Sequence, residues 1–250
     1  MRKFLVVVAR SIAAVLLAAT LMLAVWLGWL VWHFEYGLGL PDSRQLLAAS
    51  DGERICSTGG NRTFVPLAKI PPLLRRAVLA YEEPDFYERP SMNLLLEPVR
   101  SVLFNRTVLR STISATVAYC FMPRLPVNQF DRNIGRVVLM DRVERTLSKD
   151  RILEIYLNDP YFGRGAYGVA AAASAYFNKT LSELVIDEAA FIAALARAPY
   201  LNRYPERVIE RRNFVIDKML LAGVISEAQA HSAKERPLVL QDQALDGRTK

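Results

Sequence analysis

Residues 144–179 constrain the fold of this chain more than any other stretch. Ser148 is suited to cap a helix whose apolar residues, between 152 and 157, recur at helical spacing on one face. Pro160 ends this helix, and a turn that needs unusual backbone angles follows it. Three closely spaced glycines mark that turn: Gly163, Gly165 and Gly168. A second helix contains Ala170–Ala173, whose small side chains allow close approach of a neighbour. The pattern predicts two packed helices joined by a glycine hinge.

The same stretch resembles the central block of the family 51 glycosyltransferases. These are peptidoglycan polymerases found alone or at the front of bifunctional penicillin-binding proteins. The matching segments are SKDRILEIYLN (148–158), YFGRGAYG (161–168), AYFNK (175–179) and DEAAFIAALARAP (187–199). The resemblance implies a mainly α, lysozyme-like glycosyltransferase domain with a short β element. The family's chemistry lies upstream of this block.

The segment Ser11–Trp32 holds no charged residue. At about 1.5 Å per residue it is long enough to cross a bilayer core. Arg2, Lys3 and Arg10 precede it, so the positive-inside rule places the N-terminus in the cytoplasm. A cleaved signal peptide is the alternative, but the apolar run exceeds the usual length of such peptides. We expect a single-pass anchor in the bacterial inner membrane, with the domain on the periplasmic side.

These patterns divide the chain into three parts. Residues 1–35 are predicted to form a cytoplasmic tip and a transmembrane helix. Residues 36–237 are predicted to form the glycosyltransferase-like domain, and residues 238–250 a disordered tail. The net charge of +7 suits an anionic partner such as phospholipid headgroups or a pyrophosphate. Nucleic acid is disfavoured because no nucleic-acid-binding motif occurs.

The chain offers few groups for metal or nucleophilic chemistry. His33 and His231 are its only histidines, which argues against a histidine-based centre, so any chemistry must rest on carboxylates. Cys56 and Cys120 form no CxxC motif. They could pair outside the cytoplasm, but unpaired packing residues are the favoured interpretation. No metal site and no cofactor is predicted.

The local pattern around Glu82 is typical of a helix end. Pro71 and Pro72 open a helix that runs to about Glu82, and Pro84 displaces Glu83 from the helical region. The negative end of the helix dipole, neighbouring carboxylates and burial would all raise the pKa of Glu82. A raised pKa suits a general base. From the residues alone, a solvated acidic turn is the alternative.

The resemblance assigns a role to this position. Glu82 falls on the family's catalytic glutamate, which removes the proton from the acceptor sugar hydroxyl. Glu83 stands where the family has aspartate, and it is the second catalytic candidate. The family's histidine position is occupied here by Arg89 or Pro90, and its glycine by Ser91.

The second motif of the family, Gly-Ser-Thr-Ile-Thr-Gln-Gln followed shortly by Lys, is similar to Arg110–Thr116. Both glutamines are lost, and Tyr119 stands at the lysine position. The resemblance implies that the hydroxyls bind substrate, although they could also cap the next helix. These candidate substrate-binding residues are Ser111, Thr112 and Ser114.

The third motif departs most. The family has Arg-Lys, two residues and a second essential glutamate. Here Arg132 is kept, Asn133 replaces the lysine and Arg136 replaces the glutamate. A guanidinium stays protonated and cannot exchange protons, but it can bind a pyrophosphate. We therefore count Arg132 and Arg136 as substrate-binding candidates. Asp141 or Glu144 could replace the glutamate only by sharing the cleft, and Asp141 points well around the helix from Arg136.

Shorter signals predict the remaining elements. Thr63–Leu67 is expected to be a short strand. Thr180 and Glu183 match a capping box before an Ala-rich helix that ends at Pro199. A charged helix from about Glu206 is expected to end at Gly223, and Ser226–Gln229 to cap one more short helix.

The resemblance implies a membrane-anchored protein that polymerises glycan chains from lipid II. Its implied partners are lipid II, the nascent glycan chain, the inner membrane and other cell-wall synthesis proteins. An alternative hypothesis is a catalytically degenerate relative that binds lipid II or a cell-wall synthesis partner without turnover. A third is a membrane-anchored structural protein unrelated to glycans.

Overall fold

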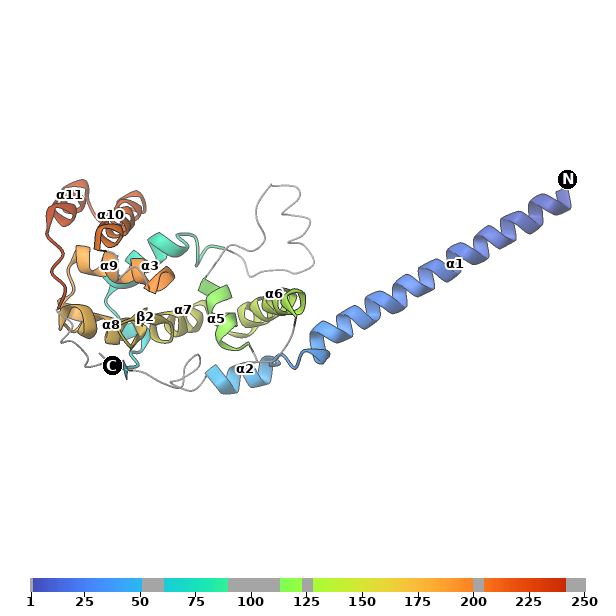
Figure 1. Cartoon of the computed structure of the whole chain (residues 1–250), viewed down its shortest axis with the longest axis horizontal. Coiled ribbons are helices and arrows are strands. Elements are labelled where there is room, and N and C mark those ends of the chain that lie inside the picture. Colours follow the sequence, from blue (N-terminus) through green and yellow to red (C-terminus); the bar gives the residue numbers. More distant parts are fainter. Residues whose placement is uncertain (1, 51–60, 90–112, 123–127, 200–204, 242–250) are drawn as a thin grey trace, which may run out of the picture.

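The structure, a computed structural model, describes residues 2–50, 61–89, 113–122, 128–199 and 205–241. These segments are mainly helical and include one small sheet, which confirms the expected fold class (Figure 1). A single helix extends away from the rest of the molecule and is followed by the packed helices of the domain.

The extended helix is α1 (Arg2–Trp32), and it continues into η1 (His33–Gly37), a turn of π-helix. By length and composition, Arg10–Gly37 could cross a membrane. Its apolar side chains are exposed to the surroundings rather than packed in a core. After η1 the chain continues into α2 (Ser43–Ser50).

One group of helices is centred on α9 (Ile186–Arg197). It packs against α3 (Pro72–Glu82) and α10 (Pro205–Leu221), and α11 (Glu227–Glu235) covers their far end. The residues of α9 are buried almost without interruption. Many of them are alanines, whose small side chains allow these neighbours to lie close.

A second group consists of α5 (Ile113–Cys120), α6 (Gln129–Thr146) and α7 (Lys149–Asn158). The side chain of Ser148 accepts a hydrogen bond from the Arg151 N–H at 3.1 Å, which confirms the predicted cap of α7. The helix ends before Pro160, as predicted.

The sheet has the strand order β1–β3–β2. Strand β1 (Asn61–Arg62) is parallel to β3 (Ala166–Tyr167), and β2 (Tyr161–Gly163) is antiparallel to β3. The glycines around β3 have positive φ angles, which confirms the predicted hinge. At Gly168, the first residue of α8 (Gly168–Phe177), a Cβ atom would lie 2.3 Å from the Asn158 carbonyl oxygen. Only glycine fits there.

The predicted strand at Thr63–Leu67 is wrong. The strand lies at Asn61–Arg62, and η2 (Leu67–Lys69) is a turn of 3₁₀ helix. The reason is that side chains of α7 take the backbone hydrogen bonds of this segment. Asn158 bonds both the N–H and the C=O of Val65, at 2.8 and 2.9 Å, and the Glu154 carboxylate accepts from the Leu67 N–H at 2.6 Å.

The capping box of Thr180 and Glu183 is present but caps only the short turn η3 (Leu181–Glu183). Helix α9 starts later, where the Glu188 carboxylate accepts from the Val185 N–H at 3.1 Å. The predicted cap at Ser226 is confirmed, and Gly223 follows the end of α10 with φ 64°.

Two further features complete the described chain. Leu238 and Leu240 pack against the core, and the Gln241 N–H donates to the Tyr176 carbonyl at 2.7 Å. Cys120 is not a free thiol, so the interpretation of it as an unpaired packing residue is wrong. Cys56 lies outside the described residues.

Candidate functional site

Glu82 is the last residue of α3. Glu83 follows in a non-helical conformation, φ −160° and ψ 84°, as expected for the residue before Pro84. The Glu82 side chain is only 2% exposed, and its Oε2 accepts a hydrogen bond from Nε of Arg197 at 2.7 Å. Arg197 is the last residue of α9, so the packing of α3 against α9 joins the two helix ends.

The surroundings of Glu82 raise its pKa. Burial is the largest cause, and the negative charge of Glu83 adds to it. The guanidinium of Arg197 and the adjoining hydroxyl of Tyr156 act in the opposite direction. The result is a buried carboxylate that can exchange a proton more readily near neutral pH than an exposed one.

Two tyrosines and Arg197 enclose this carboxylate. Tyr156 comes from α7 and is buried, and the guanidinium carbon of Arg197 lies 5.5 Å from the ring centroid of Tyr81. Burial and the Glu82 carboxylate raise the pKa of the Tyr156 hydroxyl well above its usual value, so it stays protonated and can donate to Glu82. The Arg197 side chain is 41% exposed and reaches solvent.

Glu83 belongs to a separate network. Arg89 binds two carboxylates, with Nε 2.5 Å from Oε1 of Glu83 and Nη2 2.5 Å from Oε1 of Glu144. The other oxygen of Glu83 accepts from the Ile113 N–H, at the start of α5, at 3.4 Å. Burial lowers the pKa of Arg89, but the two carboxylates outweigh it and the pKa is raised. Arg89 therefore stays charged between them.

Glu144 is also part of this network. Its side chain is fully buried in α6 and is held by Arg89. It is thus committed to an ion pair and is not placed as a free second acid. Asp141 is also buried and forms an ion pair with Arg145.

Lys149 lies beside the same network at the start of α7. Its Nζ is 4.6 Å from the ring centroid of Phe86 and is buried, with no hydrogen-bond partner among the described residues. Burial lowers its pKa, while the charges of Glu144 and Glu83 raise it. Lys149 therefore balances part of the negative charge of the two glutamates.

The second-motif candidates are only partly described. Ser111 and Thr112 lie outside the described residues. Ser114 is fully buried in α5, and its Oγ has no hydrogen-bond partner within the described segments. Of the three hydroxyls, Ser114 is thus the one whose burial the structure shows, and this burial disfavours direct contact with a substrate.

The third-motif candidates, Arg132 and Arg136, are exposed on α6. They are four residues apart and so lie on the same face of the helix. The guanidinium carbon of Arg136 lies 5.8 Å from the ring centroid of Tyr119, whose side chain is 61% exposed. The two residues that the sequence resemblance assigns to the second-motif lysine and to the second glutamate, Tyr119 and Arg136, thus contact each other.

The structure thus forms three clusters from the sequence candidates. Glu82 lies with Arg197, Glu83 with Arg89 and Glu144, and Arg136 with Tyr119. Sequence reasoning missed Arg197 and Lys149, although both fall within the segments that resemble the family. Within the described residues, no group of three or more His, Cys, Asp or Glu side chains could hold a metal ion.

Comparisons with known proteins agree with the resemblance. The sequence profile of the family described as Transglycosylase matches residues 51–220 of this chain. Penicillin-binding protein 1A of Rickettsia felis is 39% identical over 233 residues, which cover 84% of this chain and 29% of that protein. Penicillin-binding protein 1A of Escherichia coli K12 is 38% identical over 189 residues, which cover 72% of this chain and 22% of that protein.

A crystal structure of penicillin-binding protein 1A from Haemophilus influenzae aligns with 77% of this chain and 20% of its own chain. The TM-score is 0.44 and the sequence identity 27%. The chain spans less than a third of the length of the curated relatives that it matches.

Proposed function

This chain belongs to the transglycosylase family, the family 51 glycosyltransferases, and we propose that it polymerises peptidoglycan glycan chains from lipid II with Glu82 as the general base. The acceptor hydroxyl oxygen forms a bond to the anomeric carbon of the growing chain. The bond from that carbon to the undecaprenyl pyrophosphate breaks, and the hydroxyl proton passes to the Glu82 carboxylate.

One observation carries the assignment of the base. Glu82 is buried at the end of α3, and burial raises its pKa, while Arg197 favours the ionised form that can accept a proton. A base that is ionised yet has a raised pKa suits proton transfer near neutral pH. Glu83 differs, because both its oxygens are engaged by Arg89 and the Ile113 N–H. We therefore assign Glu83 a supporting part in catalysis.

We assign the leaving group to the arginines of α6. Arg132 and Arg136 are exposed on one face, and guanidinium groups bind pyrophosphate oxygens through paired hydrogen bonds. In this scheme Arg136 neutralises the charge that develops on the leaving pyrophosphate. Ser111 and Thr112 are proposed as substrate contacts on the strength of the family resemblance, whereas the burial of Ser114 disfavours the direct contact that the resemblance implies for it.

The location follows from the same proposal. The long apolar helix α1 supports a single-pass anchor in the inner membrane, with a cytoplasmic N-terminus and a periplasmic domain. Such an anchor keeps the domain at the surface of the bilayer that carries the lipid-linked substrate. Other cell-wall synthesis proteins are proposed as further partners.

The test is the formation of glycan polymer from labelled lipid II by the full-length protein in detergent micelles. Glu82→Gln is isosteric and cannot accept the proton, so we expect its rate to fall roughly 10²- to 10⁴-fold. Glu88→Gln is the matched control, because Glu88 is exposed on the same turn, and it should keep the wild-type rate. Equal rates for Glu82→Gln and the control would refute the role of Glu82.

A second candidate function is favoured by the contact of Arg136 with Tyr119. Both residues depart from the family pattern, and together they place a cation and an aromatic ring where the family has a carboxylate and a lysine. A chain altered in this way could bind lipid II without turnover. Binding of lipid II by the wild type without polymer, with polymer formed by Arg136→Glu, would support this alternative.

A further inference from the structure

The junction between α1 and the domain is built on one stripe of α6. The stripe consists of Asp131, Gly135, Val138 and Arg142, whose spacing of four, three and four places them on one helix face. Each residue meets the juxtamembrane segment His33–Pro41. This segment leaves the end of α1, passes through η1 and leads toward α2.

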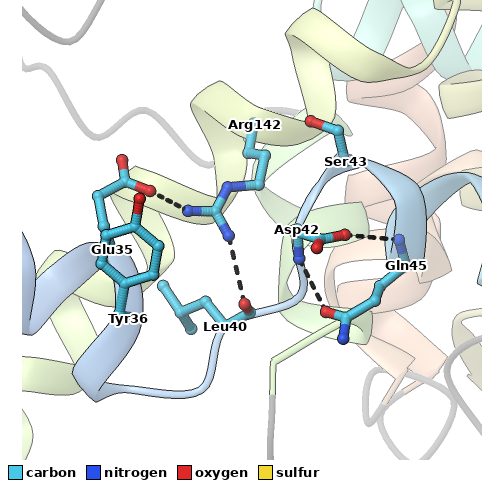
Figure 2. A pocket seen from close by; sticks show the side chains of 7 residues that line it. All are labelled: Glu35, Tyr36, Leu40, Asp42, Ser43, Gln45 and Arg142. Carbon is cyan, nitrogen blue, oxygen red and sulfur yellow. Dashed lines mark hydrogen bonds and ion pairs between the residues drawn. The ribbon is translucent and has the colours of Figure 1, made fainter.

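Arg142 contacts both Glu35 and Leu40 of the juxtamembrane segment, as Figure 2 shows. Its side chain is only 11% exposed. Its guanidinium donates to the carbonyl oxygens of Pro41 at 2.6 Å and Leu40 at 3.3 Å, and it forms an ion pair with Glu35 in η1. A pocket of about 420 Å³ opens beside these groups. One side chain of α6 thus holds both the end of the membrane helix and the turn that follows it.

The other end of the stripe makes a second polar contact. Nε2 of His33 lies 3.4 Å from Oδ1 of Asp131, close to the start of α6. Asp131 and Arg142 are eleven residues apart along α6, which is about 16 Å. Two attachment points at this separation fix the direction of α6 relative to the end of α1, whereas one contact would leave it free to pivot.

Apolar packing between these two polar contacts fixes the rotation of α6. Leu38 and Leu40 are buried and pack against Ile134 and Val138. A Cβ atom on Gly135 would lie 3.3 Å from Cδ1 of Leu38, so the glycine allows this close approach. Gly135 immediately precedes Arg136. The helix face of α6 that packs against the juxtamembrane segment is thus next to the face that carries the exposed Arg132 and Arg136.

We propose that the juxtamembrane segment His33–Pro41 positions Arg132 and Arg136 at the level of the lipid headgroups, and that Arg142 is the positioning residue. This inference rests on the proposed function, because the headgroup level is where the pyrophosphate of a lipid-linked substrate lies. The end of α1 marks the bilayer surface. The Arg142–Glu35 ion pair, the contact of His33 with Asp131 and the packing of Leu38 then hold α6 at a fixed depth relative to that surface.

The first arm of the test measures depth and needs no enzymatic activity. A spin label is attached to Asn133→Cys on the exposed face of α6, in the full-length protein in nanodiscs that contain anionic lipid. Accessibility to oxygen and to a water-soluble relaxant then reports its depth. In the otherwise unchanged protein we expect the label to lie at the depth of the membrane interface. In Arg142→Met we expect its mean depth to shift and the distribution of depths to broaden. In Arg142→Lys we expect the depth of the parent protein to return.

Two controls separate this effect from loss of folding. A label at Glu227→Cys, exposed on α11, should show the same mobility in Arg142→Met as in the parent protein. The milder variant Glu35→Gln removes only the ion pair and should shift the α6 label in the same direction. An unchanged α6 label in both Arg142→Met and Glu35→Gln would overturn the proposal.

The second arm measures lipid II. We expect Arg142→Met to lower kcat/KM about tenfold, since a charge-assisted anchor is lost and Arg132 and Arg136 no longer meet the pyrophosphate at the right depth. A kcat/KM equal to that of wild type would overturn the positioning role. If the wild type makes no polymer, the proposed function fails by itself. The positioning proposal is then tested by the depth of the label and by the dissociation constant of lipid II. An affinity for lipid II that is unaltered in Arg142→Met would overturn it.

Discussion

Replacement of Arg89 by methionine is expected to destabilise the domain strongly. The methionine side chain would fill a similar volume but leave Glu83 and Glu144 without their shared cation. Both carboxylates are buried, and Glu144 is fully so. Removal of one partner of a buried ion pair typically costs about 3–5 kcal/mol. Because Glu83 keeps the Ile113 N–H and Lys149 lies nearby, we expect the lower end, about 3 kcal/mol.

The matching assay is thermal unfolding of the full-length protein in detergent at neutral pH, followed by circular dichroism. For a domain of this size a loss of about 3 kcal/mol corresponds to a fall in Tm of roughly 6–12 °C. Arg76→Met is the matched control, since Arg76 is exposed on α3, and its Tm should stay within about 2 °C of wild type.

The double variant Arg89→Met with Glu144→Met tests the cause. It removes one carboxylate along with its cation, so we expect it to recover at least half of the lost Tm. The reasoning is refuted if Arg89→Met melts with the Arg76→Met control. It is also refuted if the double variant melts below Arg89→Met, because the carboxylate of Glu144 would then not be the source of the instability.

Gly168, Arg197 and Glu82 can each be tested by single substitutions. Gly168→Ala should lower the free energy of unfolding by at least about 3 kcal/mol, because the new Cβ would clash with the backbone of Asn158. Gly165→Ala, at φ 70° but in open space, should lower it by only about 1–2 kcal/mol. Urea unfolding measures both values, and a larger loss in Gly165→Ala would contradict the clash. Activity should fall as pH drops through the raised pKa of Glu82, and Arg197→Gln should move this acid limb to higher pH because the guanidinium lowers that pKa. Arg197→Lys should leave the pH–rate profile near that of wild type, and a limb that stays in place in Arg197→Gln would contradict the pairing. Glu82→Gln should melt no lower than wild type at neutral pH, since a raised pKa means that the folded state disfavours the charge and loses stability as pH rises through it; a clear fall in its Tm would contradict the sign.

Local signals in the sequence predicted local features of the fold. The cap at Ser148, the glycine turn before α8 and the end of α3 at Glu82 each depend on a few neighbouring residues, and all three are confirmed. Side chains from distant parts of the chain explain the failures. The segment around Val65 resembles a strand, but the amide of Asn158, 93 residues away, takes its hydrogen bonds.

The electrostatics of the candidate site were predictable only in part. The helix end and the proline after Glu83 indicated a raised pKa for Glu82. They could not indicate Arg197, which is 115 residues away, or the bridge from Arg89 to Glu144, 55 residues away. A basic residue in the last turn of α9, inside a segment that resembles the family, was the available signal for Arg197. Spacing alone does not show which helix ends meet.

The central claim is that Glu82 removes a proton during glycan polymerisation. The most direct measurement is the amount of polymer formed per bound lipid II by wild type and Glu82→Gln, with affinity and rate determined on the same preparations. We expect equal affinity for lipid II and a rate that is at least about a hundredfold lower in Glu82→Gln. Polymer formation at the wild-type rate by Glu82→Gln, at equal lipid II binding, would contradict it.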